Sequence, residues 1–245
     1  MLIPRGRGLL LASVLIALAA RAWPESATTD LTAPLSSAQI VEQMLLHDQA
    51  RASQLKHYQA LRHYQVEYRG FSATVAASMT VEVKYDAVAG KSLQIVSQSG
   101  SKFLIEKVLK RAVDSEKEAF QQRSSMALTP SNYRFQLAGT EILRGRPAYI
   151  LDVEPLVPSK FLCRGKIWVD AADFALARME TQPAKSPSFW ISRTLIHYTG
   201  SKTDGFWMPQ EVRSETSVRV GGAAVLTIDY GTYEIASNSP PVQRH

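Results

Sequence analysis

The feature that most constrains the fold of this 245-residue chain is a long run of period-two alternation over residues 132–235. Its clearest part is residues 163–180, where apolar residues take every second position on both sides of residues 170–173. Such alternation is typical of half-buried strands, and an aspartate that bonds to backbone N–H groups two residues on favours a turn. We therefore predict an antiparallel hairpin in the middle of a long meander.

Two amphipathic helices are expected before the meander. Ser36 and Gln39 have the spacing of a capping box, and the apolar residues that follow recur at helical spacing as far as Leu55. A second helical pattern runs from about Lys102 to Ala119. Together with about ten strands of ordinary length, these helices predict an α+β fold, in which a curved antiparallel sheet wraps around two amphipathic helices.

The first 22 residues have the pattern of a secretory signal. Arg5 and Arg7 precede an apolar run over residues 9–20, which is shorter than the roughly 20 residues of a membrane span. We predict a signal peptide (1–22), a flexible lead-in (23–35), a single domain (36–235) and a disordered tail (236–245). The alternative is that the N-terminal segment stays uncleaved as an anchor.

The net charge and the cysteine content limit which partners and which cellular compartment can be expected. Removing residues 1–22 deletes three arginines and no acidic residue, so the net charge falls from +6 to +3. This charge is too small and too scattered to predict a nucleic-acid partner. The single cysteine, Cys163, allows no intrachain disulfide, and export without one favours a bacterial periplasm. No stable membrane span is expected after signal cleavage.

The residue types that could carry catalysis have a plainer explanation in each case. Cys163 with His197 could form a nucleophile and base, but Cys163 lies on the apolar face of its strand, where a free cysteine is usually core. Asp170 and Asp173 could form an acid pair, but their spacing suits turn formers better. We therefore expect no enzymatic activity.

No metal or cofactor site is expected either. The histidines lack the spacing that places two imidazoles on one helical face, and no Cys-x-x-Cys or glycine-rich phosphate loop occurs. The histidines considered are His47, His57, His63 and His197.

Trp168 stands on the polar face of its strand. A large aromatic residue there is either a cross-strand packing partner or part of a binding surface. With the neighbouring Arg164 and Lys166 it forms a candidate surface for a protein partner.

A set of apolar strand residues is expected to face the helices. These residues either line a ligand-binding concavity or form plain core under the helices, and the pattern does not separate the two readings. They are Val81, Val83, Phe135, Leu137, Ile167, Val169 and Ile228.

Three short motifs resemble the LolA/LolB-like superfamily, which includes outer membrane lipoprotein-sorting proteins and RseB/MucB-type periplasmic regulators. The motifs are Arg62-His-Tyr64, Gly165-Lys-Ile-Trp-Val-Asp170 followed by Arg178, and Gly205-Phe-Trp-Met-Pro209. The resemblance spans residues 36–235. It implies an incomplete β-barrel whose concavity holds acyl chains under a helical lid.

The resemblance also implies an arginine that locks the lid. Arg69 is a candidate for it, although the residues around Arg69 do not match the family. No cysteine lies near residue 22, so the chain is not expected to be a lipid-anchored receptor of the LolB kind.

The function expected from residues and resemblance together is that of a periplasmic, non-enzymatic carrier or binding protein. Its ligand would be a lipoprotein acyl chain or another lipid, held by burial of apolar surface. The alternative is a periplasmic regulatory or scaffold module that binds another envelope protein.

Overall fold

The computed structural model describes residues 35–159, 161–186, 191–219 and 221–237, and these form one compact unit. The predicted signal peptide, residues 23–34 of the lead-in and residues 238–245 lie outside the described residues. Within the described residues, no helix has the length and apolar character needed to span a bilayer.

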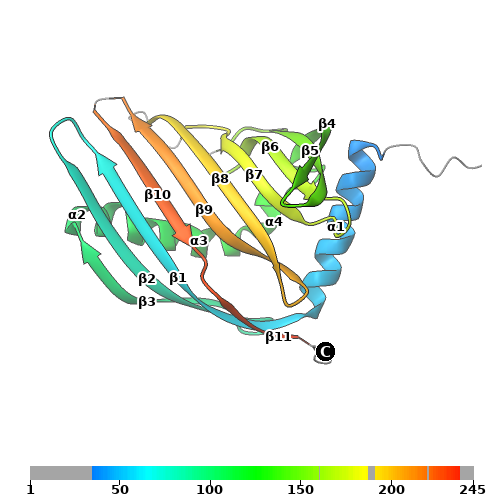
Figure 1. Cartoon of the computed structure of the whole chain (residues 1–245), viewed down its shortest axis with the longest axis horizontal. Coiled ribbons are helices and arrows are strands. Elements are labelled where there is room, and N and C mark those ends of the chain that lie inside the picture. The colour runs from blue at the N-terminus through cyan, green and yellow to red at the C-terminus, as the bar shows by residue number, and fades with distance from the viewer. Residues whose placement is uncertain (1–34, 160, 187–190, 220, 238–245) are drawn as a thin grey trace, which may run out of the picture. The chain divides into compact units, whose positions relative to one another are not determined.

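One large antiparallel sheet dominates this unit (Figure 1). Its strand order is β3-β2-β1-β10-β9-β8-β7-β6-β5-β4, and β11 pairs with β1 beyond the end of β10. In the described part of the chain β3 and β4 are not paired with each other, so the sheet is curved but open. The strands are β1 (Leu55–Arg69), β2 (Thr74–Asp86), β3 (Gly90–Gly100), β4 (Tyr133–Leu143), β5 (Arg146–Pro155), β6 (Cys163–Asp170), β7 (Leu176–Pro183), β8 (Ile191–Thr203), β9 (Phe206–Val218), β10 (Ala223–Asp229) and β11 (Tyr233–Ser237).

The predicted fold class is therefore confirmed, with differences at the ends of elements. Leu55 begins β1 directly after the first helix instead of ending that helix. The alternation over residues 225–235 predicts one last strand, but the chain forms two, because β10 and β11 pair with different stretches of β1. The last strand also reaches Ser237, two residues beyond the predicted boundary.

The helices occupy the two predicted regions. In α1 (Ser37–Gln54) the capping box is present: Gln39 N donates to Ser36 Oγ at 3.3 Å, and Ser36 N donates to Gln39 Oε1 at 2.9 Å. The second region is a succession of shorter segments instead of one regular helix, with a π-helical turn near its start. These segments are α2 (Lys102–Leu104), η1 (Ile105–Leu109), α3 (Lys110–Gln121) and α4 (Arg123–Met126).

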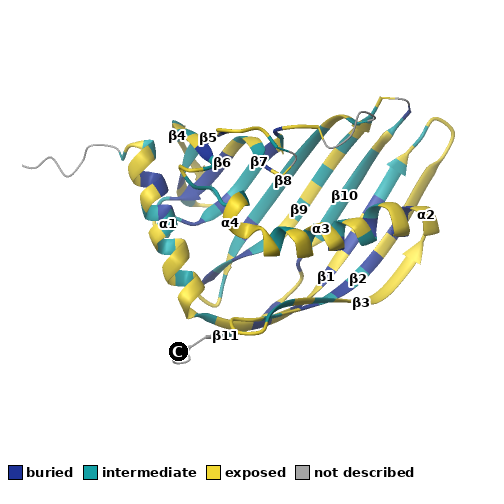
Figure 2. Cartoon of the chain, turned by 180° about the vertical axis from the view of Figure 1, so that it is seen from behind, coloured by how far each residue is buried: buried dark blue, intermediate teal, exposed yellow. Residues whose placement is uncertain are grey.

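Both helical regions pack on the same face of the sheet, called here the inner face (Figure 2). The α2–η1–α3 region covers β1 and β2, with Leu109 and Val113 buried against Val81 and Val83. At the other end of the sheet, α1 packs on β4, β5 and β6. The sheet thus carries two separate buried clusters at its two ends.

At Gly165 the backbone of the neighbouring strand leaves no room for a side chain. Its φ is +141°, and a Cβ built there would lie 2.3 Å from the carbonyl oxygen of Glu180 on β7. Replacing Gly165 with alanine is expected to lower the free energy of unfolding by about 2 kcal/mol, because backbone must move to admit the methyl group.

Urea unfolding measures this loss, and Gly139→Ala is the matched control. Gly139 also lies in a strand with a positive φ, +149°, but nothing lies within 4 Å of its added Cβ. Alanine at Gly139 should therefore cost less than alanine at Gly165, and equal losses would contradict the close approach.

Candidate functional site

The inner face carries one continuous line of directly paired residues across nine strands, which we call the floor row. Each member is the register partner of the next, so their side chains point to the same side. In order from β2 to β4 the floor row is Met79, Tyr64, Ile228, Val212, Tyr198, Met179, Ile167, Leu151 and Leu137.

The two ends of the floor row are covered and its middle is not. Tyr64 and Ile167 are 0% exposed, one in each buried cluster. The four residues between them are only half-buried, and Figure 2 shows β8 and β10 mostly in the intermediate colour, with β9 alternating between intermediate and exposed. The middle of the inner face is therefore apolar surface that the chain's own helices leave partly open.

All seven predicted ligand-lining residues lie on the inner face, but not together. Val81, Val83 and Ile228 belong to the cluster under η1 and α3. The others belong to the cluster under α1: Phe135, Leu137, Ile167 and Val169. Val81, Val83, Ile167 and Val169 are fully buried. Phe135 and Leu137 are half-buried on the edge strand β4 beside the cluster under α1, so Ile228 is the one of the seven that lies in the partly open middle.

A buried ion cluster fastens α3 to the sheet. The carboxylate of Glu116 on α3 pairs with Arg62 of β1 and Lys91 of β3, and the Tyr64 hydroxyl donates to it at 2.8 Å. The Arg62 guanidinium carbon lies 4.3 Å from the centre of the Tyr230 ring. Arg62 is only 2% exposed, so this cluster is held inside the apolar interface.

The charges of this cluster stabilise one another. Burial raises the pKa of Glu116, but Arg62 and Lys91 outweigh that effect and hold its pKa at about 2. Burial lowers the pKa of Arg62, yet the net shift is upward because Glu116 stabilises the charged form. The Nε of Arg62 is a buried donor without a partner within the described structure. Two cations therefore share one carboxylate.

Arg69, the candidate for the lid-locking arginine, is the wrong residue for that role. Its side chain is 72% exposed and pairs with Glu67 on its own strand. Arg62, inside the motif that resembles the superfamily, is the arginine that contacts a helix. The sequence pattern could have identified Arg62, because it lies on the same face of β1 as the apolar residues Tyr58, Ala60 and Tyr64.

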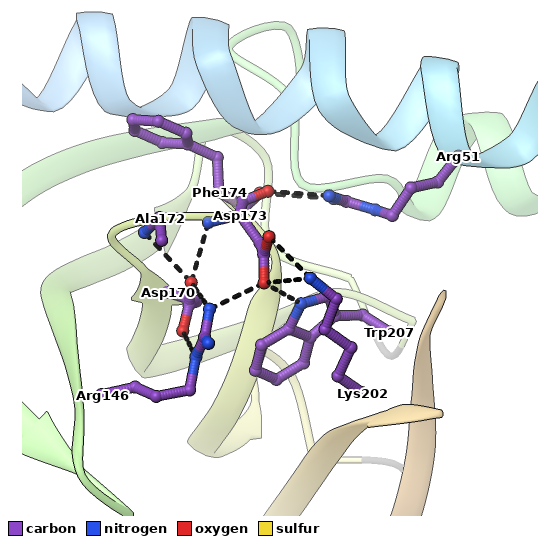
Figure 3. A network of polar contacts seen from close by, with 8 residues as sticks. All are labelled: Arg51, Arg146, Asp170, Ala172, Asp173, Phe174, Lys202 and Trp207. Atoms are coloured by element: carbon purple, nitrogen blue, oxygen red, sulfur yellow. Dashed lines mark hydrogen bonds and ion pairs between the residues drawn. The ribbon is translucent and has the colours of Figure 1, made fainter. Parts of the chain in front are cut away.

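The turn at residues 170–173 is confirmed and organises a second polar network (Figure 3). Asp170 Oδ1 accepts from Ala172 N at 3.0 Å and from Asp173 N at 2.8 Å, which closes the turn as predicted. Arg146 donates to both carboxylate oxygens of Asp170, from Nε at 2.5 Å and from Nη2 at 2.8 Å. Burial raises the pKa of Asp170, but Arg146 and the backbone donors lower it below its ordinary value.

Asp173 continues this network on the outer face and its own backbone reaches α1. Its Oδ2 accepts from Arg146 Nη2 at 2.7 Å, from Trp207 Nε1 at 3.0 Å and from Lys202 Nζ at 3.0 Å. Its carbonyl oxygen accepts from Arg51 Nη1 of α1 at 2.7 Å. The turn therefore fastens α1 in the way that Glu116 fastens α3 (Figure 3).

Trp168 is not the exposed residue that a partner surface would need. It is 5% exposed, its Nε1 donates to Glu141 Oε2 at 2.7 Å, and the Arg178 guanidinium lies 4.6 Å from its ring centre. The packing interpretation of Trp168 is the one that fits. Arg164 and Lys166 are exposed, and they pair with Glu154 at 3.9 Å and Asp152 at 2.7 Å.

The structure does not bring Cys163 and His197 together as a nucleophile and base. Cys163 Sγ lies 3.8 Å from the Tyr133 hydroxyl, whereas His197 lies 3.9 Å from Glu180. Burial raises the pKa of Cys163, and the contact with the Tyr133 hydroxyl offsets only part of that rise. Within the described residues, no group of three or more His, Cys, Asp or Glu side chains could hold a metal ion.

Cys163 should therefore react slowly with thiol reagents. At pH 7.5 we expect labelling by a chromogenic disulfide to be at least about tenfold slower in the folded protein than in urea, because a half-buried thiol with a raised pKa yields little thiolate. Stopped-flow absorbance measures both rates. Equal rates in the two states would contradict the burial of Cys163.

Comparisons with known proteins find likeness in structure but not in sequence. No protein-family model and no curated protein matches this sequence. A DUF1329 family protein from Desulfovibrio piger is matched at 12% identity and a TM-score of 0.44, over 84% of this chain and 96% of that one. A LolA superfamily protein from Nitrosomonas europaea is matched at 12% identity and a TM-score of 0.36, with the same two shares. The MucA/MucB complex of Pseudomonas aeruginosa is matched at 11% identity and a TM-score of 0.25, over 80% of this chain and 94% of that one.

These matches include the superfamily that the sequence resembles. The open antiparallel sheet with helices on one face is likewise the architecture that the resemblance implies. Because every TM-score is below 0.5, what those proteins bind carries no argument for this chain.

Proposed function

We propose that this chain is a periplasmic, non-enzymatic binding protein that carries an acyl chain of a lipoprotein or another lipid. The single observation that carries the proposal is the half-buried middle of the floor row, framed by two helices on the same face. The apolar run in residues 1–22, read as an export signal, supports a periplasmic location.

An acyl chain suits this surface because three of the four half-buried residues of the floor row are apolar, and the fourth, Tyr198, adds a single hydroxyl. Val212, Met179 and Ile228 contribute aliphatic or thioether surface, and the strand backbones beneath them are already paired in the sheet. Burying each methylene of a ligand is worth up to about 0.8 kcal/mol, so affinity should rise by up to about fourfold per carbon. A polar ligand would gain no comparable contact here.

The helices would act as covers that close over the ligand. The α3 helix is held by the charges at Glu116, and α1 by the two carbonyls that accept from Arg51. Both helices also pack on the sheet through buried apolar side chains, and neither forms part of the strand ladder, so a helix can shift over the sheet without breaking that ladder. Such movement would expose the buried ends of the floor row to a long ligand.

Native mass spectrometry of the exported protein, purified without detergent, tests this function directly. We expect a bound mass in the lipid range, and we expect the affinity for saturated fatty acids to increase from ten to fourteen carbons. A bare protein that also takes up no fatty acid would overturn the proposal and would favour the partner-binding alternative.

A pair of neighbouring substitutions on β10 locates the binding surface. Leu226 is half-buried on the inner face, and Leu226→Glu should weaken fatty-acid binding by at least about tenfold, because a charge replaces apolar contact. Val225 is also half-buried but lies on the opposite face, so Val225→Glu is the matched control. Equal losses in the two variants would show that the ligand does not bind on the inner face.

A further inference from the structure

The outer face of the sheet holds a pocket that the acyl-binding proposal does not use. It has a volume of about 390 Å³ and lies over β5 to β9, on the side opposite to α1 and α3. This volume is in the range of small-molecule sites. We call it the outer pocket.

The tip of the β4–β5 hairpin closes one side of the outer pocket. Arg144 and Gly145 form this tip with φ values of +51° and +79°, and Arg144 Nη1 donates to Gln210 Oε1 of β9 at 2.9 Å. Strands β6, β7 and β8 lie between β5 and β9 in the sheet, so this contact spans the outer face. The hairpin therefore folds over the sheet and encloses the space beneath.

The turn conformation alone does not explain an arginine at its tip. A two-residue turn with positive φ at both positions favours Asn or Gly, and a left-handed conformation costs other residues about 1 kcal/mol. Arg144 bears this cost in an exposed turn. The contact that its side chain makes across the pocket is what sets Arg144 apart from an ordinary turn residue.

The wall of the outer pocket combines apolar surface with small residues. Leu143 and the Trp207 ring line it, and Ala148 and Ala177 lie where longer side chains would fill the space. Ala148 is 2% and Ala177 6% exposed, so these alanines belong to the folded body of the sheet. Such a wall accommodates a compact apolar or aromatic group.

Among the cations that line the outer pocket, Arg144 differs from the other three in the partner it contacts. Four cations line it, and three of them pair with a carboxylate: Arg146 with Asp170 and Asp173, Lys202 with Asp173, and Arg178 with Glu180. The fourth, Arg144, donates instead to the uncharged amide of Gln210. An arginine facing a neutral amide can exchange that contact for a bidentate pair with a carboxylate at little cost.

We propose that the outer pocket binds a small monoanionic molecule with an aromatic or short aliphatic body. The ligand's carboxylate pairs with Arg144 at the hairpin tip, and its body lies against Trp207, Ala148 and Ala177. This site is separate from the floor row, because its residues point to the opposite face of the same strands.

Calorimetric titration with 2-naphthoate, and with the uncharged 2-naphthamide as the matched probe, tests this proposal at pH 7.5. We expect saturable binding of one naphthoate, at least tenfold tighter than naphthamide. Arg144→Gln should lower the affinity for naphthoate at least tenfold and change the affinity for naphthamide by less than twofold. Arg134→Gln, an exposed charge on the outer face of the same strand β4 but outside the outer pocket, should leave both unchanged.

The indole N–H resonance of Trp207, identified with Trp207→Phe, should shift on adding naphthoate to the otherwise unchanged protein. No saturable naphthoate binding, or equal loss in Arg144→Gln and Arg134→Gln, overturns the proposal. Leu226→Glu separates this proposal from the acyl-binding one, because it should weaken fatty-acid binding at least tenfold and keep naphthoate affinity within twofold. Loss of naphthoate binding in Leu226→Glu would place the probe on the inner face and would also overturn the outer site.

Discussion

Glu116→Gln is expected to lower the free energy of unfolding by about 3 kcal/mol at pH 7, because it leaves two buried cations without a counter-charge. Arg62 is 2% exposed and Lys91 12%, so neither charge can turn to water without moving α3. Glutamine retains the size of the side chain and an acceptor oxygen. The loss therefore reports charge and not packing.

Urea unfolding measures this loss, and Glu106→Gln is the matched control. Glu106 and Lys110 form a pair four residues apart in the same helical region, but Glu106 is 57% exposed. Exposed pairs of this kind contribute about 0.5 kcal/mol or less. A loss in Glu116→Gln no larger than that in Glu106→Gln would contradict the cluster.

The same carboxylate predicts a pH dependence with a definite sign. The folded protein holds the pKa of Glu116 at about 2, below its ordinary value near 4.5. The carboxylate therefore contributes its full stabilisation of the folded state at pH values above about 4.5. This stabilisation is lost as the pH falls from about 5 to about 2. In Glu116→Gln, the free energy of unfolding should depend less on pH between about pH 5 and about pH 2. In the unsubstituted protein, amide hydrogen exchange should accelerate in α3 before it does in the sheet as the pH falls through this range.

Asp170→Ala is expected to cost about 3 kcal/mol, because it removes four hydrogen bonds at a buried carboxylate. Asp170 is 2% exposed and accepts from Arg146 twice and from the backbone of Ala172 and Asp173. Asp170→Asn should cost less, because its amide oxygen can still close the turn. Urea unfolding should show a larger loss of stability in Asp170→Ala than in Asp170→Asn. The difference between the two losses measures the hydrogen bonds that close the turn, and the loss in Asp170→Asn measures the charge.

Asp152→Asn is the control for Asp170→Asn. Asp152 lies on the same outer face and pairs with Lys166 at 2.7 Å, but both side chains are about half exposed, 48% and 47%. Its loss should stay within about 0.5 kcal/mol. In Asp170→Ala the amides of α1 should also exchange faster, because Arg51 is held by carbonyls of the same turn. Unchanged exchange in α1 would show that the turn does not hold that helix.

Local periodicity was sufficient to predict the elements of this fold. The alternation around the 170–173 turn, the capping box at Ser36 and Gln39, and the helical pattern from Lys102 each depend on residues close in sequence. The seven residues assigned to the concave side all lie on the inner face, because side-chain direction in a strand follows from its alternation. The same rule placed Trp168 on the outer face, but a position on that face does not say whether other side chains will cover it, and in the fold they do.

Residues close in sequence therefore specify which side of each strand faces the helices, and where the chain turns. Which long-range partners meet depends on the folded chain. Glu116 reaches Arg62 across 54 positions and Lys91 across 25, and Arg144 reaches Gln210 across 66. Those contacts depend on strand register and on where the helices dock, which arise from packing across the whole sheet and leave no periodic trace along the chain. For the same reason, only the folded structure shows that the middle of the floor row remains partly open.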